Sequence, residues 1–219
     1  MIANRPGMLA RGPWRPEQIE ASWREEPFEP PAELERRADE AVRELRERGS
    51  PAHDGMATRL AAYSEPNGGL LLELQPVRWA LRLLEGSACD SLTALCVVRA
   101  QDGRWLAGRR AGWVSQWAGR WALGAGGAVD LGESPAETLS RELAEEWRLV
   151  PDSLSVEALV GLPNGMTMLV GLATVPDDST PVPDAEHDEW SWWPQAVDAW
   201  PPDADERLKL MGWFLDART

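Results

Sequence analysis

The stretch GAVDLGESPAETLSRELAEEWRL, from Gly127 to Leu149, decides the fold of this 219-residue chain. It starts in a glycine-rich loop and continues as a sequence typical of an amphipathic helix. Ser134 can cap that helix, Pro135 suits its first position, and Glu137 stands where a capping box needs an acceptor. These residues predict a helix with a well-defined first turn.

The predicted helix has two faces. Four apolar side chains recur at helical spacing and suit packing against a sheet: Ala136, Leu139, Leu143 and Trp147. About a quarter-turn away, at spacings of three and four, lie the carboxylates of Glu142, Glu145 and Glu146. Each like-charge pair costs on the order of a few tenths of a kcal/mol, so helix energetics do not favour this cluster. A hard divalent cation would offset the repulsion, whereas a solvated acidic face is the plainer alternative.

The same stretch resembles the Nudix box, G-x5-E-x7-R-E-U-x-E-E-x-G-U, in which U is a bulky apolar residue. The matching positions are Gly127, Glu133, Arg141, Glu142, Leu143, Glu145, Glu146 and Leu149. Arg148 stands where the family has glycine, near the helix end, where a left-handed backbone is often needed. The resemblance covers about Ser91 to the C-terminus and implies a metal-dependent pyrophosphohydrolase.

The resemblance also implies roles for the matching residues. The expected ligands of Mg²⁺ or Mn²⁺ are Glu142, Glu145 and Glu146. Glu145 or Glu146 would also activate water, and Arg141 would orient the carboxylates through Glu133. Gly127 would let the backbone approach the substrate and metal closely. Bound Mg²⁺ would neutralise the phosphates, orient the attacking water and lower its pKa.

A loop before the box carries further candidates. In AGWVSQWAGRW, Trp113 or Trp117 can stack on a nucleobase, and packing beneath the loop is the alternative. Arg109, Arg110 or Arg120 can meet a substrate phosphate. These residues are the expected substrate-binding group outside the box.

A late acidic segment, from Glu186 to Glu189, holds one more candidate. The resemblance implies that a glutamate here adds a metal contact or acts as a base, and Glu189 is the candidate; an acidic surface loop is the alternative. His187 is expected to be a surface residue. Four tryptophans in strand or helix patterns are expected in the core: Trp105, Trp121, Trp147 and Trp213.

Outward from the box, the pattern predicts an α/β domain over residues 90–219. Strands are expected in SLTALCVVRA, RWLAGRRA, RWALGAGGAV, SLSVEALVGL, GMTMLVGLATV and Glu189–Trp193, and a closing helix over Ala204–Asp216. Together with the box helix they predict a Nudix-type α/β/α sandwich with a mixed sheet.

Residues 1–89 are expected to form a smaller α+β accessory segment. The predicted elements are a short helix over Gln18–Arg24, a helix that stops at Gly49, and strands over Met56–Tyr63 and Leu70–Leu74. Ile19, Trp23, Asp54, Gly55 and the LLLELQ run share letters with the Nudix branch that cleaves UDP-glucose. Because the segment is rich in apolar residues, we expect it to pack on the Nudix domain or on a second copy in a homodimer, and to help wall the substrate pocket.

The composition excludes some functions. A formal net charge of −14 argues against binding nucleic acid through a broad basic surface. Small phosphorylated ligands remain compatible, because a metal can bring them to an acidic site. No apolar run is long enough to cross a bilayer. Two cysteines, Cys89 and Cys96, are too few for a disulfide framework, which fits a reducing cytoplasm.

The expected function is hydrolysis of a nucleoside diphosphate linked to another moiety. A nucleotide-sugar is the first substrate class, with ADP-ribose or an oxidised nucleoside triphosphate as alternatives in the same chemistry. Two rivals are a non-catalytic Nudix domain that senses a nucleotide and a Nudix-fold isomerase acting on an isoprenoid diphosphate. The complete set of box glutamates favours the hydrolase.

Overall fold

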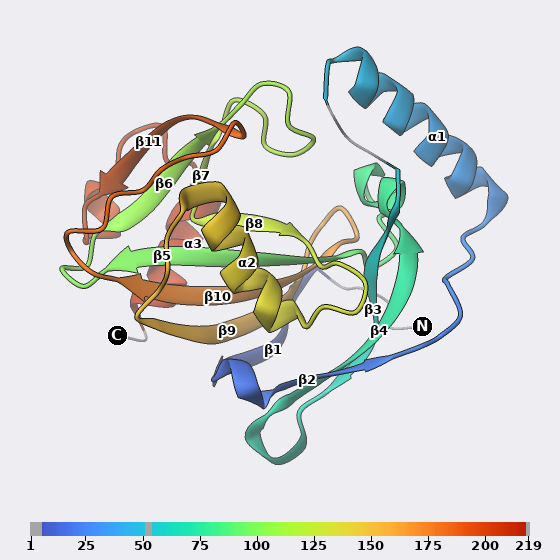
Figure 1. The fold of residues 1–219 in the computed structure, drawn as a ribbon, viewed down its shortest axis with the longest axis horizontal. Helices are drawn as coiled ribbons and strands as arrows, with labels where there is room; N and C mark the ends of the chain where they lie inside the picture. The colour runs from blue at the N-terminus through green and yellow to red at the C-terminus, as the bar shows by residue number, and fades with distance from the viewer. Residues whose placement is uncertain (1–5, 51–53, 218–219) are drawn as a thin grey trace.

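The structure is a computed structural model that describes residues 6–50 and 54–217. Its largest element is an eight-stranded mixed sheet (Figure 1). The strands are β1 Gly7–Trp14, β5 Leu92–Ala100, β6 Trp105–Arg110, β7 Trp121–Leu123, β8 Ala125–Ala128, β9 Ser153–Gly161, β10 Thr167–Val175 and β11 His187–Trp193. Six of them follow the order β1-β9-β10-β5-β6-β11, while β8 pairs with β5 and β7 with β6. Strands β10 and β5 run parallel, and the other pairs are antiparallel.

Helices cover both faces of this sheet. Helix α2, Pro135–Trp147, crosses one face and α3, Glu206–Asp216, lies behind the other (Figure 1). The apolar side of α2 is buried in one core cluster, as its spacing predicts. Leu208 and Leu215 of α3 lie in a second cluster. The predicted α/β sandwich with a mixed sheet is therefore confirmed.

A second, three-stranded sheet is built from the N-terminal segment. Its strands are β2 Ile19–Trp23, β4 Leu70–Arg78 and β3 Met56–Ser64, in that order. The helix expected over Gln18–Arg24 is wrong, because most of these residues form β2, which runs parallel to β4. Ile19, Ala21 and Trp23 alternate along the strand and face the core. A period of two outweighs the apolar spacing of four on which the helix prediction rested.

The N-terminal segment packs on the Nudix-like part, as expected. Strand β1 is an unpredicted edge strand of the large sheet, where it pairs with β9. Leu60, Leu72 and Leu74 of the small sheet share a buried cluster with the apolar side of α2. The Thr58 N–H also donates to the Val129 carbonyl at 3.1 Å. The two parts of the chain therefore share one core.

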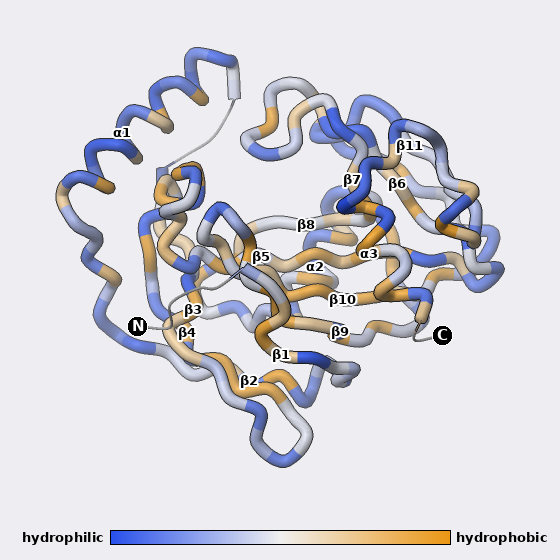
Figure 2. The backbone as a smooth tube through the Cα atoms, turned by 180° about the vertical axis from the view of Figure 1, so that it is seen from behind, coloured by the Kyte–Doolittle hydropathy of each residue, from blue (hydrophilic) through white to orange (hydrophobic). Residues whose placement is uncertain are grey.

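Helix α1, Ala32–Glu47, stands at the outer side of the small sheet and is mostly hydrophilic (Figure 2). Its buried residues Ala38 and Val42 pack in a third cluster with Ala80 and Leu81. Those two partners belong to η3, a 3-10 turn over Trp79–Leu83. The predicted helix and its stop at Gly49, which has a φ of +82°, are confirmed.

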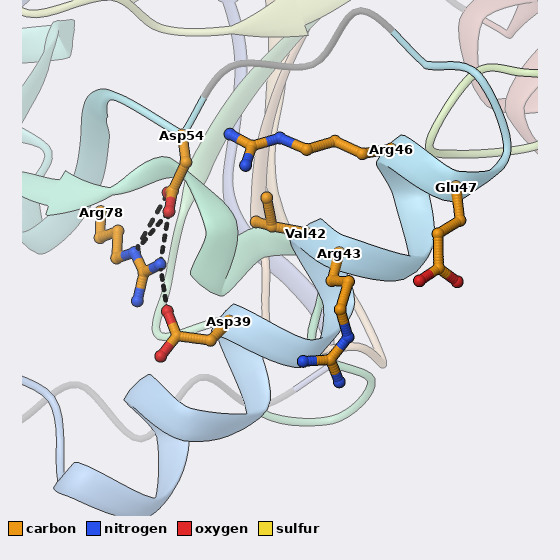
Figure 3. Close-up of a pocket in the computed structure, with 7 residues that line it drawn as sticks. All are labelled: Asp39, Val42, Arg43, Arg46, Glu47, Asp54 and Arg78. Atoms are coloured by element: carbon orange, nitrogen blue, oxygen red, sulfur yellow. Dashed lines mark hydrogen bonds and ion pairs between the residues drawn. The ribbon is translucent and has the colours of Figure 1, made fainter.

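Ion pairs fasten α1 to β4. Arg78 donates hydrogen bonds to Glu35, Asp39 and Asp54, and Figure 3 shows the last two converging on its guanidinium. A cavity of about 550 Å³ lies beside this network and is also lined by Arg43 and other residues of α1. None of the residues that line this cavity belongs to the Gly127–Leu149 stretch.

The buried aromatic residues follow the prediction with one exception. Trp105 and Trp147 are fully buried, and Trp121 packs partly buried against the second cluster. Trp213 is 40% exposed on α3, so its predicted place in the core is wrong. Within residues 6–50 and 54–217, no helix has the length and apolar character needed to span a membrane.

Candidate active site

Helix α2 begins and ends at defined residues. The Ser134 side chain accepts a hydrogen bond from the Ala136 N–H, and the Glu137 carboxylate accepts one from the Ser134 N–H at 2.8 Å. This is the capping box that the sequence predicts. The helix ends at Arg148, which takes a left-handed conformation with a φ of +55°. The expected need for a positive φ at this position is confirmed.

The three glutamates of α2 differ in exposure. Glu142 is 9% exposed and Glu146 only 4%, whereas the Glu145 side chain is 58% exposed. Two carboxylates are thus held one turn apart in the protein, and the third lies at the surface. Burial raises the pKa of Glu142, and it raises the pKa of Glu146 well above its usual range. Desolvation disfavours the charged form of both groups. Repulsion by Glu145 and Glu186 adds to the effect on Glu142, and repulsion by Glu142 and Glu186 adds to the effect on Glu146.

Arg141 joins these carboxylates to the preceding loop. Its guanidinium donates to Glu133 at 2.9 Å, to Glu142 at 2.8 Å and to Glu145 at 3.0 Å. The hydrogen bond to Glu133 is the largest influence raising the pKa of Arg141. Partial burial would raise the pKa of Glu133, but hydrogen bonds from Arg141 and Thr138 outweigh it and lower that pKa. Arg141 therefore stays cationic and fixes the positions of three acidic side chains.

The two buried glutamates lie against the backbone of strand β8. The Gly126 N–H donates to one oxygen of Glu146 at 3.0 Å. A Cβ atom placed on Gly127 would lie 2.1 Å from an oxygen of Glu142. Only glycine at position 127 leaves space for the Glu142 carboxylate at its present position. The glycine turn before the helix thus serves the carboxylates directly.

The other oxygen of Glu146, Oε2, faces Arg110 and His187. It lies 3.6 Å from an Arg110 nitrogen and 3.6 Å from the Nε2 atom of His187. Both Glu146 Oε2 and His187 Nε2 are buried and have no hydrogen-bond partner. Arg110 also forms a 2.8 Å ion pair with Glu186. We call Glu142, Glu145, Glu146 and Glu186 the acidic cluster.

His187 is not the surface residue that the sequence suggests. It is buried, its ring packs tilted against Trp147 with a centroid distance of 4.4 Å, and its Nδ1 lies 3.3 Å from Asp184. Burial and the nearby Arg110 lower the pKa of His187, and the contact with Asp184 opposes this. The residue is therefore part of the wall behind Glu146.

Comparison with known proteins agrees with this geometry. The family model described as NUDIX domain matches residues 91–212, more than half of the chain. This chain belongs to the Nudix family. It is a Nudix pyrophosphohydrolase by class. A search of curated proteins found no match.

Several solved structures resemble the Nudix enzyme described here. A MutT protein from Methanosarcina mazei is 22% identical with a TM-score of 0.45, over 59% of this chain and 96% of that one. The NUDIX domain of Shewanella oneidensis NrtR, solved with ADP ribose, is 22% identical with a TM-score of 0.46, over 59% and 86%. An Ap4A hydrolase from C. elegans is 16% identical with a TM-score of 0.45, over 58% and 96%.

In the Nudix structure Glu186, and not Glu189, shares Arg110 with Glu146. Glu189 is exposed, and its carboxylate lies 3.7 Å from the exposed Arg109. An irregularity in β11 between His187 and Glu189 shifts the register against β6. Glu186 directly precedes this strand and influences the pKa values of Glu142 and Glu146. The acidic segment was recognisable in the sequence; a metal contact by Glu189 stays a prediction, and Glu186 is the residue of this segment that pairs with Arg110.

The loop between β6 and β7 carries the remaining candidates of the Nudix enzyme. Trp113 and Trp117 are half-buried, and Trp117, at a φ of +59°, packs against the second core cluster. Arg109 and Arg120 are exposed. Arg110 is the arginine of this group that reaches the acidic cluster, through Glu146 and Glu186.

Within the described ranges, no three His, Cys, Asp or Glu side chains of this Nudix enzyme are grouped as a ready metal site. The carboxylates of α2 are engaged in hydrogen bonds instead. Arg141 binds oxygens of Glu142 and Glu145, and Gly126 binds one oxygen of Glu146. The chemical donor set nevertheless suits a hard divalent cation, because it consists of carboxylate oxygens and one of them, Glu146 Oε2, is buried without a hydrogen bond.

Proposed function

We propose that this Nudix enzyme is a Mg²⁺- or Mn²⁺-dependent hydrolase of a nucleoside diphosphate linked to another moiety. The observation that carries the proposal is the position of Glu142 and Glu146. Both carboxylates are buried against the backbone of β8, and Glu146 Oε2 has no hydrogen-bond partner. A buried carboxylate oxygen without a partner is costly, and a cation would satisfy it.

The metal ligands of the proposal are Glu142, Glu145 and Glu146, with Glu186 facing them as a further oxygen donor. A bound divalent cation would neutralise the phosphates of the substrate and lower the pKa of water. Arg141 holds Glu142 and Glu145 in position and is itself oriented by Glu133. Glu145 or Glu146 accepts the proton of the attacking water.

The substrate class of the proposal is a small nucleotide-type diphosphate, with a nucleotide-sugar first. Trp113 or Trp117 offers an aromatic face to the base, since neither side chain is fully buried. Arg109 and Arg120 are exposed and available to phosphate. ADP-ribose and an oxidised nucleoside triphosphate are the other members of the test panel.

Glu146→Gln tests the proposal. The change removes a charge at nearly constant shape, so hydrolysis should fall by at least about 100-fold, the scale of a lost catalytic group. The measurement is phosphate release after phosphatase coupling, across the substrate panel with Mg²⁺. Glu44→Gln, an exposed site on α1, is the matched control and should leave turnover unchanged. Near-wild-type turnover in purified, folded Glu146→Gln would contradict the assignment.

A further inference from the structure

Arg82 belongs to the N-terminal segment but is held close to the active-site loops. It lies in η3, whose neighbours Ala80 and Leu81 are fully buried against α1. The Trp79 N–H donates to the Gly55 carbonyl at 2.8 Å, and the Leu84 N–H closes the turn onto Leu81. The backbone that carries Arg82 is therefore fixed on both sides.

Two contacts connect η3 to the Nudix domain near the acidic cluster. The Gln116 side-chain amide, in the loop between β6 and β7, donates to the Arg82 carbonyl at 3.4 Å and contacts the Met166 sulfur at 3.5 Å. The Ala88 N–H, just after η3, donates to the Asn164 carbonyl at 3.2 Å. Arg82 thus adjoins the loop that holds the tryptophan candidates.

The Arg82 side chain has no partner for its inner nitrogen. Its Nε is buried and makes no hydrogen bond, and across residues 6–50 and 54–217 no carboxylate forms an ion pair with this guanidinium. The nearest aromatic ring is that of Trp79, with its centroid 5.7 Å away. A buried Nε atom without a partner is costly, since buried polar groups in folded proteins are almost always bonded.

The charges around Arg82 are those of the acidic cluster. Burial lowers the pKa of Arg82 to about 10, attraction to Glu142 and Glu186 opposes that effect, and repulsion by Arg110 adds to it. The side chain is still a cation at neutral pH. Arg82, from the N-terminal segment, therefore lies within electrostatic range of Glu142 and Glu186, and Arg110, from β6, pairs directly with Glu186.

We propose that Arg82 binds the diphosphate of the substrate, together with Arg110, on the side of the acidic cluster that faces the N-terminal segment. The inference rests on the proposed function, because it takes the diphosphate to be bound at that cluster. A guanidinium presents a planar fork of donors that matches phosphate oxygens. Arg110 is already paired with Glu186 at 2.8 Å, whereas Arg82 has its donors uncommitted to any carboxylate of the described chain.

The proposed role accounts for an arginine that has no carboxylate partner. A divalent cation held by the carboxylates would neutralise one part of a diphosphate, and the remaining negative charge needs a cation from another direction. The N-terminal segment supplies that cation without disturbing the box, in which Arg141 is already bonded to three carboxylates. Arg82 thereby contributes to substrate binding without being a metal ligand.

The test uses the full-length protein, Mg²⁺ and methylene diphosphonate, a diphosphate that cannot be hydrolysed. Calorimetric titration should show that Arg82→Ala weakens binding of methylene diphosphonate at least about tenfold, the scale of a lost charged hydrogen bond. Arg82→Lys should bind methylene diphosphonate more weakly than the wild type and more tightly than Arg82→Ala, because lysine keeps the charge but lacks the planar fork of donors. Arg207→Ala, an exposed arginine on α3, is the control and should bind like the wild type.

Two further measurements separate substrate binding from a structural role. Arg82→Ala should keep or raise the melting temperature, and it should bind Mg²⁺ alone at least as tightly as the wild type, because a repelling cation is gone. In kinetics, the loss should appear mainly in KM if Arg82 binds ground state and transition state alike. A structural residue would instead lower the melting temperature and weaken Mg²⁺ binding.

Unchanged methylene diphosphonate binding in Arg82→Ala would overturn the inference and leave the proposed function standing. Weaker methylene diphosphonate binding that is accompanied by a lower melting temperature would also overturn the inference. If the wild type binds neither Mg²⁺ nor methylene diphosphonate, the proposed function fails and the inference fails with it. A selective loss of methylene diphosphonate binding, with Mg²⁺ binding intact, supports both.

Discussion

Helix α2 and the turn η3 each carry an arginine, and the two arginines have opposite surroundings. Arg141 on α2 donates to Glu133, Glu142 and Glu145. Arg82 on η3 has a buried Nε with no partner. A buried charge is tolerated when it is paired and costs free energy when it is not. The comparison indicates that Arg141 maintains the site, whereas Arg82 is available for a ligand.

The same contrast holds for the regions that carry these arginines. The box helix contains its own cap, its own carboxylates and the arginine that binds them, within 23 residues. The N-terminal segment is held in place by tertiary contacts: β1 pairs with β9, and its leucines join the core beneath α2. The box is locally complete, and the segment depends on the rest of the chain.

Removing the N-terminal segment should have the largest effect on stability. A chain that starts at Ala88 lacks β1, η3 and the small sheet, and it exposes the core that Leu72 and Leu74 share with α2. We expect it to lose its cooperative melting transition, as followed by circular dichroism. Leu72→Ala in the full chain is a graded control and should cost about 2–5 kcal/mol. A soluble truncation with an unchanged melting temperature would show that the box region folds alone.

Gly127→Ala should have the next largest effect, and on activity more than on stability. The new Cβ would lie 2.1 Å from an oxygen of Glu142, so that carboxylate must move. Misplacement of a catalytic group by about 1 Å can cost about 100-fold in rate, and hydrolysis should fall on that scale. Gly112→Ala meets no atom within 4 Å and is the matched control. Equal rates for both variants would show that the position of Glu142 is not critical.

Arg148→Gly should have the smallest effect and should stabilise the protein. Arg148 has a φ of +55°, a conformation that costs a non-glycine residue about 1 kcal/mol. Urea unfolding should therefore show a gain of up to about 1 kcal/mol for glycine. Arg148→Ala keeps the strained backbone and should show no such gain. If alanine stabilises as much as glycine, the effect comes from the side chain and not from the backbone.

Sequence reasoning succeeded where the structure is local. The capping box, the apolar side of α2 and the contacts of Arg141 with Glu133 all lie within a few helical turns. Sequence reasoning failed where the partners are distant. Strand β1 pairs with residues about 150 positions later, and β2 forms a strand because it pairs with β4. The pairing of Glu186 with Arg110 joins segments more than 70 residues apart, and the position of Arg82 depends on the packing of η3. No local spacing contains this information.

The most direct test of the account is the melting temperature of the full-length protein against Mg²⁺ concentration. Only the folded state gathers the box glutamates, so Mg²⁺ should stabilise the wild type progressively as its concentration passes the dissociation constant. EDTA should reverse the shift and abolish hydrolysis. Glu142→Gln combined with Glu146→Gln should remove the shift while the fold survives. A melting temperature indifferent to millimolar Mg²⁺, together with hydrolysis that persists in EDTA, would contradict the assignment of the acidic cluster as a metal site.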